Sequence, residues 1–183
     1  MRPSRFDPKL PLAFVLSALV FPASACGQQE APPVDDLETR AREIHERVIT
    51  IDTHDDISPN FATAESDPGQ REGRQVTLPK MREGGLDMAF FVVYVGQTER
   101  TAENYAAAKE RASELFDAIH RLTDEMYPDE IGFAWTPDDV ERLHAEGKLA
   151  ATIGIENGYS IGKDLSLLEV YHGRGARYFG LTH

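Results

Sequence analysis

Two largely apolar runs constrain the fold of this 183-residue chain more than any other feature. Residues 87–95 (DMAFFVVYV) and 149–155 (LAATIGI) do not alternate polar and apolar side chains, as a strand with one solvated face does. Such runs are typical of parallel strands that are buried on both faces. Both faces of the sheet therefore have to be covered, and helices between the strands can provide that cover.

The segments between these runs carry helical patterns. Apolar residues recur at steps of three and four between residues 105 and 126, and Thr136-Pro137-Asp138-Asp139 combines a cap, a first-turn proline and acids typical of a helix start. We predict strands over 48–52, 87–95, 131–135, 149–155 and 177–182, helices over 105–126, 136–147 and 164–174, and a short helix near Leu37. Residues 55–80 are rich in Gly, Pro, Asp and Ser and are predicted to form a long loop.

Alternating strands and helices predict a parallel α/β sheet, which either stays open and doubly wound or closes into a (β/α)8 barrel. No G-x-G-x-x-G motif follows the first strand, so the main sign of a dinucleotide-binding fold is missing. A barrel needs about 250 residues. If the sheet closes, residues 37–183 would form a TIM-like barrel that is truncated after about five strands, because the chain stops on a strand at His183.

The first 25 residues have the three parts of a secretory signal peptide: a basic start, the apolar run 10–21 and the small-residue exit Ala23-Ser24-Ala25. The apolar run is shorter than the roughly 20 residues of a membrane span. Cys26, the one cysteine of the chain, follows directly, and Ala-Ser-Ala-Cys resembles the lipobox of bacterial lipoproteins. The alternative is plain secretion after cleavage before Cys26. We expect a lipidated Cys26, a polar tether over 26–36 and export to the periplasm or cell envelope.

The charge of the chain excludes some partners. The 31 acidic residues outnumber the 19 basic ones, which makes nucleic acid a poor partner and leaves the lipid anchor as the expected link to a membrane. A single cysteine forms neither an internal disulfide nor a thiolate metal cluster. Any metal ion therefore has to be held by His, Asp and Glu.

Three candidate positions lie at the carboxyl ends of predicted strands. His54 and Asp56 are two residues apart, so in an extended segment they point the same way and suit zinc or a similar ion. Glu156 ends the 149–155 strand, and His183 ends the last one. Because active sites of barrels lie at this edge, the three positions are candidates for one site. Taken singly, they also fit a solvated turn, a turn-capping carboxylate and a loop histidine.

The remaining histidines fall inside predicted helices, where surface or core-edge roles are expected: His45, His120, His144 and His172. Asp52 alternates with His54 and is either an acid that orients His54 or a satisfied polar residue at the strand end.

Taken together, these motifs resemble the renal or membrane dipeptidase family of metallopeptidases. The matching stretches are 48–57 (VITIDTHDDI), 78–95, 126–162 and 175–183 (GARYFGLTH). They cover essentially the whole chain beyond the predicted tether, in the order of the family.

The resemblance implies a (β/α)8 barrel that holds two zinc ions and hydrolyses dipeptides through a zinc-bridged hydroxide, often with tolerance for a D-residue at the second position. His54 and Asp56 match ligands of one zinc, Glu156 matches the carboxylate that bridges both, and His183 matches a histidine that contacts the scissile region. Tyr159 stands where many members have His. The remaining ligands of the family come from later strands, so we expect this fragment alone to be inactive and poorly folded. A homodimer of the full-length protein is left open.

Two alternatives remain at this stage. Another amidohydrolase-type barrel would commonly begin with H-x-H and bridge its metals with a carboxylated lysine, whereas Asp56 and Glu156 stand at those places. The other alternative is not an enzyme: an envelope lipoprotein that binds peptides or partners without catalysis.

Overall fold

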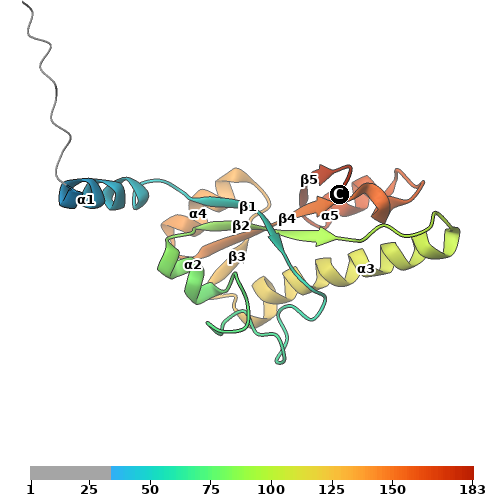
Figure 1. Ribbon diagram of the computed structural model, residues 1–183, viewed down its shortest axis with the longest axis horizontal. Helices are drawn as coiled ribbons and strands as arrows, with labels where there is room; N and C mark the ends of the chain where they lie inside the picture. Colours follow the sequence, from blue (N-terminus) through green and yellow to red (C-terminus); the bar gives the residue numbers. More distant parts are fainter. Residues whose placement is uncertain (1–33) are drawn as a thin grey trace, which may run out of the picture. The chain divides into compact units, whose positions relative to one another are not determined.

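The computed structural model describes residues 34–183 (Figure 1). Its strands are β1 (Ile51–Asp56), β2 (Met88–Tyr94), β3 (Ile131–Phe133), β4 (Leu149–Glu156) and β5 (Ala176–Gly180). Its helices are α1 (Val34–His45), α2 (Leu78–Gly84), α3 (Ala102–Arg121), the π-helical turn η1 (Leu122–Met126), α4 (Pro137–Ala145), the 3-10 turn η2 (Gly158–Ile161) and α5 (Leu167–Gly173). This alternation confirms the predicted α/β class.

All pairings in the five-stranded sheet are parallel. The order is β1-β2-β4, and the far edge of β4 is shared by two strands. The short β3 pairs with the first half of β4 up to Ala151, and β5 pairs with the second half from Ile153 onward. Four strand positions, β1-β2-β4-β5, therefore make up the part of the sheet that carries the carboxyl-terminal edge.

Helix α3 covers one face of the sheet and runs beneath β2 and β4 (Figure 1), whereas α4 packs against the amino ends of these strands on the opposite face. Phe91 and Val93 of β2 and Ile153 and Ile155 of β4 are buried against the apolar stripe of α3, which includes Phe116. The opposite face of the strands lies on the inner side of the sheet. Near the amino ends of the strands this inner face is apolar, and Met88, Phe90 and Ile51 line a hollow of about 380 Å³ there.

A tyrosine shows how strongly the sheet curves. Tyr178 of β5 donates a hydrogen bond from its hydroxyl to the Thr53 carbonyl oxygen of β1, at 3.0 Å. In a flat sheet β5 and β1 would lie three interstrand spacings apart, roughly 14 Å, which is further than a tyrosine side chain reaches. The inner face is therefore concave, as in a barrel wall. This curvature excludes the open, doubly wound alternative.

A glycine makes this reach possible. The ring of Tyr178 crosses β4 at Gly154, where a Cβ atom would lie only 2.0 Å from the ring carbon Cζ. Any side chain at this position would push the ring away from β1.

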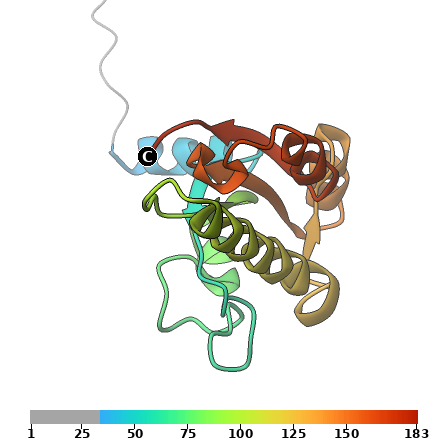
Figure 2. The ribbon, with the colours of Figure 1, turned by 90° about the vertical axis from the view of Figure 1, so that its right-hand side faces the viewer.

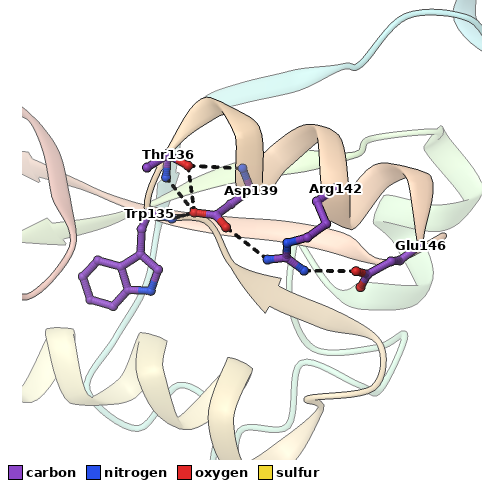
Figure 3. Close-up of polar contacts among 5 residues, drawn as sticks. All are labelled: Trp135, Thr136, Asp139, Arg142 and Glu146. Atoms are coloured by element: carbon purple, nitrogen blue, oxygen red, sulfur yellow. Dashed lines mark hydrogen bonds and ion pairs between the residues drawn. The ribbon is translucent and has the colours of Figure 1, made fainter.

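The sequence predicts a helix start at Thr136-Pro137, and the structure forms a capping box there, at the start of α4 (Figure 3). The Thr136 hydroxyl accepts a hydrogen bond from the Asp139 amide, and the Asp139 carboxylate accepts from the amides of Thr136 and Trp135 at 3.0 and 3.1 Å. Arg142 then pairs with Asp139 and with Glu146, at 3.1 Å each. The box fixes the direction in which the chain leaves β3.

Some predicted boundaries are wrong. The first strand begins at Ile51 rather than residue 48, so His54 and Asp56 lie within the strand instead of after it. The predicted loop over 55–80 ends earlier than expected, because Thr77 caps α2 and Pro79 occupies its first turn. The predicted helix over 164–174 is shorter, and the turn η2 precedes it. The segment between β1 and α2 remains irregular (Figure 2).

Arg121 holds this irregular segment to the end of α3. Its guanidinium donates hydrogen bonds to the carbonyl oxygens of Pro59, Phe61 and Ala62, at 3.2, 2.8 and 2.7 Å. Ala62 has a φ of 57°, a left-handed conformation that these bonds help to stabilise.

Several predictions lie outside the described residues. They are the signal peptide over 1–25, the lipidated Cys26 and all but the last three residues of the 26–36 tether, since α1 already begins at Val34. Within residues 34–183, none of the helices combines the length and the apolar character that a membrane-spanning helix requires.

The capping box predicts a pH-dependent contribution to stability. Hydrogen bonds from Arg142 and Thr136 hold the pKa of Asp139 below its usual value of 3.8. The stabilisation is therefore fully present above pH 3.8 and is lost as the pH falls through the lowered pKa. We expect Asp139→Asn to lower the free energy of unfolding of the full-length protein by about 1 kcal/mol at pH 7, and by much less at pH 3, in urea denaturation.

Asp138→Asn is the matched control, because Asp138 is exposed in the same helical turn and stands outside the box. Equal destabilisation by the two substitutions at pH 7 would show that only the helix dipole is involved.

Candidate metal centre

Three potential ligands converge on the inner face at the carboxyl ends of β1 and β4. One ligand atom from each of His54, Asp56 and Glu156 lies within 4.8 Å of the others. His54 Nε2 is 3.2 Å from Glu156 Oε2 and 3.7 Å from Asp56 Oδ1. β2 separates the two strands, so the curvature of the sheet brings these side chains together.

A bulge shapes the first half of this site. The register of β1 against β2 shifts between Asp52 and Asp55. These two residues are three positions apart in β1, but their partners in β2 are only two positions apart. Such a bulge re-aims the side chains that follow it. Asp52 stabilises it, since its carboxylate accepts a hydrogen bond from the His54 amide at 3.0 Å. Asp52 therefore holds the backbone of His54 and does not contact its ring, which favours the reading of Asp52 as a satisfied polar residue.

Tyr178 orients the imidazole of His54. Its hydroxyl donates to Thr53, so it can accept a hydrogen bond from His54 Nδ1, which lies 3.3 Å away. Burial raises the pKa of the Tyr178 hydroxyl, and the carboxylates of Glu156, Asp56 and Asp52 raise it further, so the hydroxyl keeps its proton at neutral pH. With its proton on Nδ1, His54 directs the lone pair of Nε2 toward the two carboxylates.

The strained turn after β4 positions Glu156. Asn157 is buried and has a φ of 74°. Its side-chain amide donates to the Val95 carbonyl oxygen at 3.0 Å, and its side-chain oxygen accepts from the Tyr159 amide at 3.1 Å. The end of β4 is thereby tied to the end of β2. A non-glycine residue in this conformation is costly and is typical of a functional site.

His183 lies at the same edge. Its Nε2 is 3.9 Å from Glu156 Oε1, whereas His54 lies nearest to the other oxygen of that carboxylate, Oε2. Tyr94, at the end of β2, packs its ring against His183 with centroids 4.7 Å apart and places its hydroxyl 3.4 Å from His183 Nδ1. Gly158 holds the segment before His183 close to the end of β4, because its amide donates a hydrogen bond to the Leu181 carbonyl oxygen at 3.1 Å.

The acids of β1 repel one another. Burial, with repulsion from Asp52 and Asp56, raises the pKa of Asp55 to about 7, although Arg74 and His54 act in the opposite direction. A cation among these carboxylates would offset this repulsion.

The donor set fits a divalent metal ion. One imidazole nitrogen and two carboxylates are ligands that zinc accepts. Glu156 is only 21% exposed, whereas His54 and Asp56 are 45% and 69% exposed, so the point between them is open to an ion from solvent. The second carboxylate oxygen of Glu156, Oε1, lies 3.9 Å from His183 Nε2.

The structure therefore brings together all four predicted residues: His54, Asp56, Glu156 and His183. Their binding of metal or substrate remains a prediction. The four other histidines lie in or at the end of α1, α3, α4 and α5, as expected. The sequence analysis missed Tyr94, Tyr178 and Asn157. The first two stand in apolar strands and look like core residues, whereas Asn-Gly after a buried strand was a usable signal.

The curved parallel sheet and this cluster define an α/β-barrel type of protein with a candidate metal centre at its carboxyl edge. Residues 38–183 match the membrane dipeptidase family (peptidase family M19), and the chain belongs to this family.

Curated relatives agree with this family. Dipeptidase ataJ of Aspergillus terreus is 30% identical over 155 residues, which are 79% of this chain and 37% of the relative. Dipeptidase aclJ of Aspergillus oryzae is 32% identical over 114 residues, covering 60% of this chain and 26% of the relative. The chain thus spans between about a quarter and little more than a third of the length of these relatives.

Solved structures share the fold. The probable dipeptidase PvdM of Pseudomonas aeruginosa superimposes with a TM-score of 0.74 at 25% identity, over 82% of this chain and 38% of that one. A dipeptidase AC, described as a metallopeptidase of family M19, gives a TM-score of 0.58 at 25% identity over 74% of this chain and 43% of its own.

The contact between Tyr178 and His54 predicts a change in metal affinity. We expect Tyr178→Phe to weaken zinc binding by the full-length protein about tenfold, because the imidazole loses the partner that fixes its tautomer. A competition titration against a chromophoric chelator measures this.

Tyr127→Phe is the control, since it removes a hydroxyl that bonds Asp67 at 2.7 Å outside the centre. Unchanged zinc affinity in Tyr178→Phe would contradict the orienting role.

Proposed function

We propose that the full-length protein is a zinc-dependent dipeptidase that cleaves the single peptide bond of a dipeptide. The observation that carries this proposal is the convergence of His54, Asp56 and Glu156 at the carboxyl edge of the curved sheet. Membership of the M19 family supports the reaction class. The metal, the mechanism and the substrates remain proposals, because the chain spans 37% of the relative it matches over most of its length.

In this proposal His54, Asp56 and Glu156 would together hold the zinc ions, with Glu156 as the ligand that the ions would share. When bound, the ions would supply Lewis acidity and a water molecule whose pKa is lowered to about 7. Tyr178 keeps the proton of His54 on Nδ1, so Nε2 stays available as a ligand. Asn157 and the β1 bulge hold the carboxylates at the spacing that a shared site requires.

His183 contacts the substrate in this proposal. Its Nδ1 faces the Tyr94 hydroxyl, so Nε2 is the nitrogen that is free to donate toward the centre. There it would stabilise the negative charge that develops on the carbonyl oxygen of the scissile bond. The 60% exposure of its side chain leaves it accessible to a ligand.

The N-terminal segment suggests where the reaction takes place. We propose that residues 1–25 direct export and that Cys26 carries a lipid anchor, with the catalytic part in the periplasm or cell envelope. Metabolic labelling with a radioactive fatty acid tests this, because Cys26→Ser would abolish the label while plain secretion would show none in either protein.

The centre predicts a strict metal dependence. Treatment with a chelator, which removes the metal, or Glu156→Gln, which removes the shared carboxylate, should lower kcat/KM for L-Ala-L-Ala and L-Ala-D-Ala by roughly three orders of magnitude. Metal content by mass spectrometry should fall in parallel, and added zinc should restore only the chelated parent.

Glu110→Gln serves as the control, because Glu110 is exposed on α3. Retained hydrolysis after Glu156→Gln and metal stripping would rule out the proposed mechanism.

We further propose that residues 34–183 are inactive by themselves. Among the described residues β1 pairs only with β2, and the outer edge of β5 has no partner strand, so two edges of the curved sheet are open. Such edges favour aggregation. We expect no dipeptide hydrolysis and a broad thermal transition, and a sharp melt with two zinc ions bound per chain would contradict this.

A further inference from the structure

An exposed loop lies next to the candidate metal centre. It joins β2 to α3 over residues 95–101, and its residues 96–100 are all exposed. Gln97 and Arg100 of this β2–α3 loop line a hollow of about 670 Å³. His183, which lies at the edge of the centre, also lines this hollow. The conformation of the loop therefore decides the shape of one side of the hollow.

One tyrosine hydroxyl holds the middle of the loop. The Tyr159 hydroxyl donates a hydrogen bond to the Glu99 carbonyl oxygen at 2.8 Å. Its single proton is thereby used, so the Thr98 hydroxyl, 2.9 Å away, is the donor in the contact between the two hydroxyls. Residues 96–100 bury no side chain in the core, so polar contacts of this kind decide how firmly the loop is held.

Tyr159 is itself fixed in the structure. It is only 7% exposed, and its ring packs against that of Tyr105 in α3 with centroids 5.2 Å apart. Gly162 lets the turn η2 approach this ring closely, because a Cβ atom at the glycine would lie 2.9 Å from Tyr105. The Tyr159 amide also donates to the side-chain oxygen of Asn157 at 3.1 Å. The hydroxyl is therefore presented to the loop from a fixed position.

Asn157 connects the same turn to the start of the loop. It directly follows Glu156, and its side-chain amide donates to the Val95 carbonyl oxygen at 3.0 Å. Through Asn157 and Tyr159, the turn after β4 holds the loop at its start and in its middle. The turn that carries a candidate metal ligand thus also fixes the neighbouring loop.

We propose that Tyr159 is a positioning residue, which holds the β2–α3 loop in place before a substrate arrives and so keeps this side of the hollow preformed. A preformed loop lowers the ordering cost of binding. The proposal rests on the proposed dipeptidase function and adds to it a residue that acts through the loop. Loss of the Tyr159 hydroxyl should therefore weaken substrate binding and leave the chemical step and the bound zinc unchanged.

Three variants of the full-length zinc-loaded protein test this role. Tyr159→Phe removes both hydrogen bonds to the loop and keeps the ring that packs on Tyr105. Thr98→Val removes one of the two bonds. Tyr171→Phe is the matched control, because Tyr171 is also buried and its hydroxyl donates to the Ser160 carbonyl oxygen at 3.1 Å, which is a bond to the turn η2 rather than to the loop.

Hydrogen–deuterium exchange measures the loop independently of activity. We expect the amides of residues 96–101 to exchange about tenfold faster in Tyr159→Phe than in the parent, and to be affected less in Thr98→Val. In Tyr171→Phe they should exchange at the parental rate. Unchanged exchange in Tyr159→Phe, or an equal rise in Tyr171→Phe, would overturn the positioning role.

Steady-state kinetics on Ala-Ala test the consequence for the substrate. We expect KM to rise about fivefold in Tyr159→Phe, with kcat changed less than twofold and the zinc content unchanged. Adding Thr98→Val to this variant should raise KM no further, because both substitutions remove the same contact. An unchanged KM, a fall in kcat alone or a loss of zinc in Tyr159→Phe would overturn the proposal and leave the dipeptidase function standing.

A parent that does not cleave Ala-Ala would refute the proposed function instead. The exchange measurement then decides the positioning role separately. Faster exchange of the loop in Tyr159→Phe but not in Tyr171→Phe supports this role, and any other pattern overturns it.

Discussion

The curvature of the parallel sheet is the constraint on which the candidate centre depends. β1 and β4 are not neighbours, and in a flat sheet roughly 10 Å would separate them. The concave inner face instead brings His54 Nε2 to 3.2 Å from Glu156 Oε2. Tyr178 helps to stabilise this curvature, because its ring crosses β4 at Gly154 and its hydroxyl donates a hydrogen bond to the Thr53 carbonyl oxygen of β1. The same tyrosine therefore packs across the curved sheet and contacts the candidate metal ligand His54.

The inner face also separates two environments along the strands. At the amino ends it is apolar, with Ile51, Met88 and Phe90 around one hollow. At the carboxyl ends it carries the acids of β1 and Glu156, which are costly to bring together unless a cation neutralises them. The apolar packing and the candidate metal centre thus lie at different ends of the same strands, an arrangement that is general for barrel enzymes. The bulge in β1 and the strained turn at Asn157 lie at the functional end.

The sequence predicted the parts of the fold that local patterns determine. The apolar runs gave β2 and β4 nearly to the residue, and Thr136-Pro137 gave the start of α4. The strand β1 was misplaced because its acidic residues have low strand propensity, and pairing with β2 overrides that preference. The candidate site residues were predicted from their position at the ends of predicted strands. The contact of Tyr178 with His54, in contrast, spans 124 residues and depends on curvature that no local pattern encodes.

The most direct test of the account is anomalous diffraction at the zinc edge from crystals of the full-length protein. We expect a zinc peak bonded to His54 Nε2, Asp56 and Glu156 at about 2.0–2.2 Å, with Tyr178 still in contact with His54 Nδ1. A zinc ion held by other residues, with the Glu156 carboxylate turned toward bulk solvent, would contradict it.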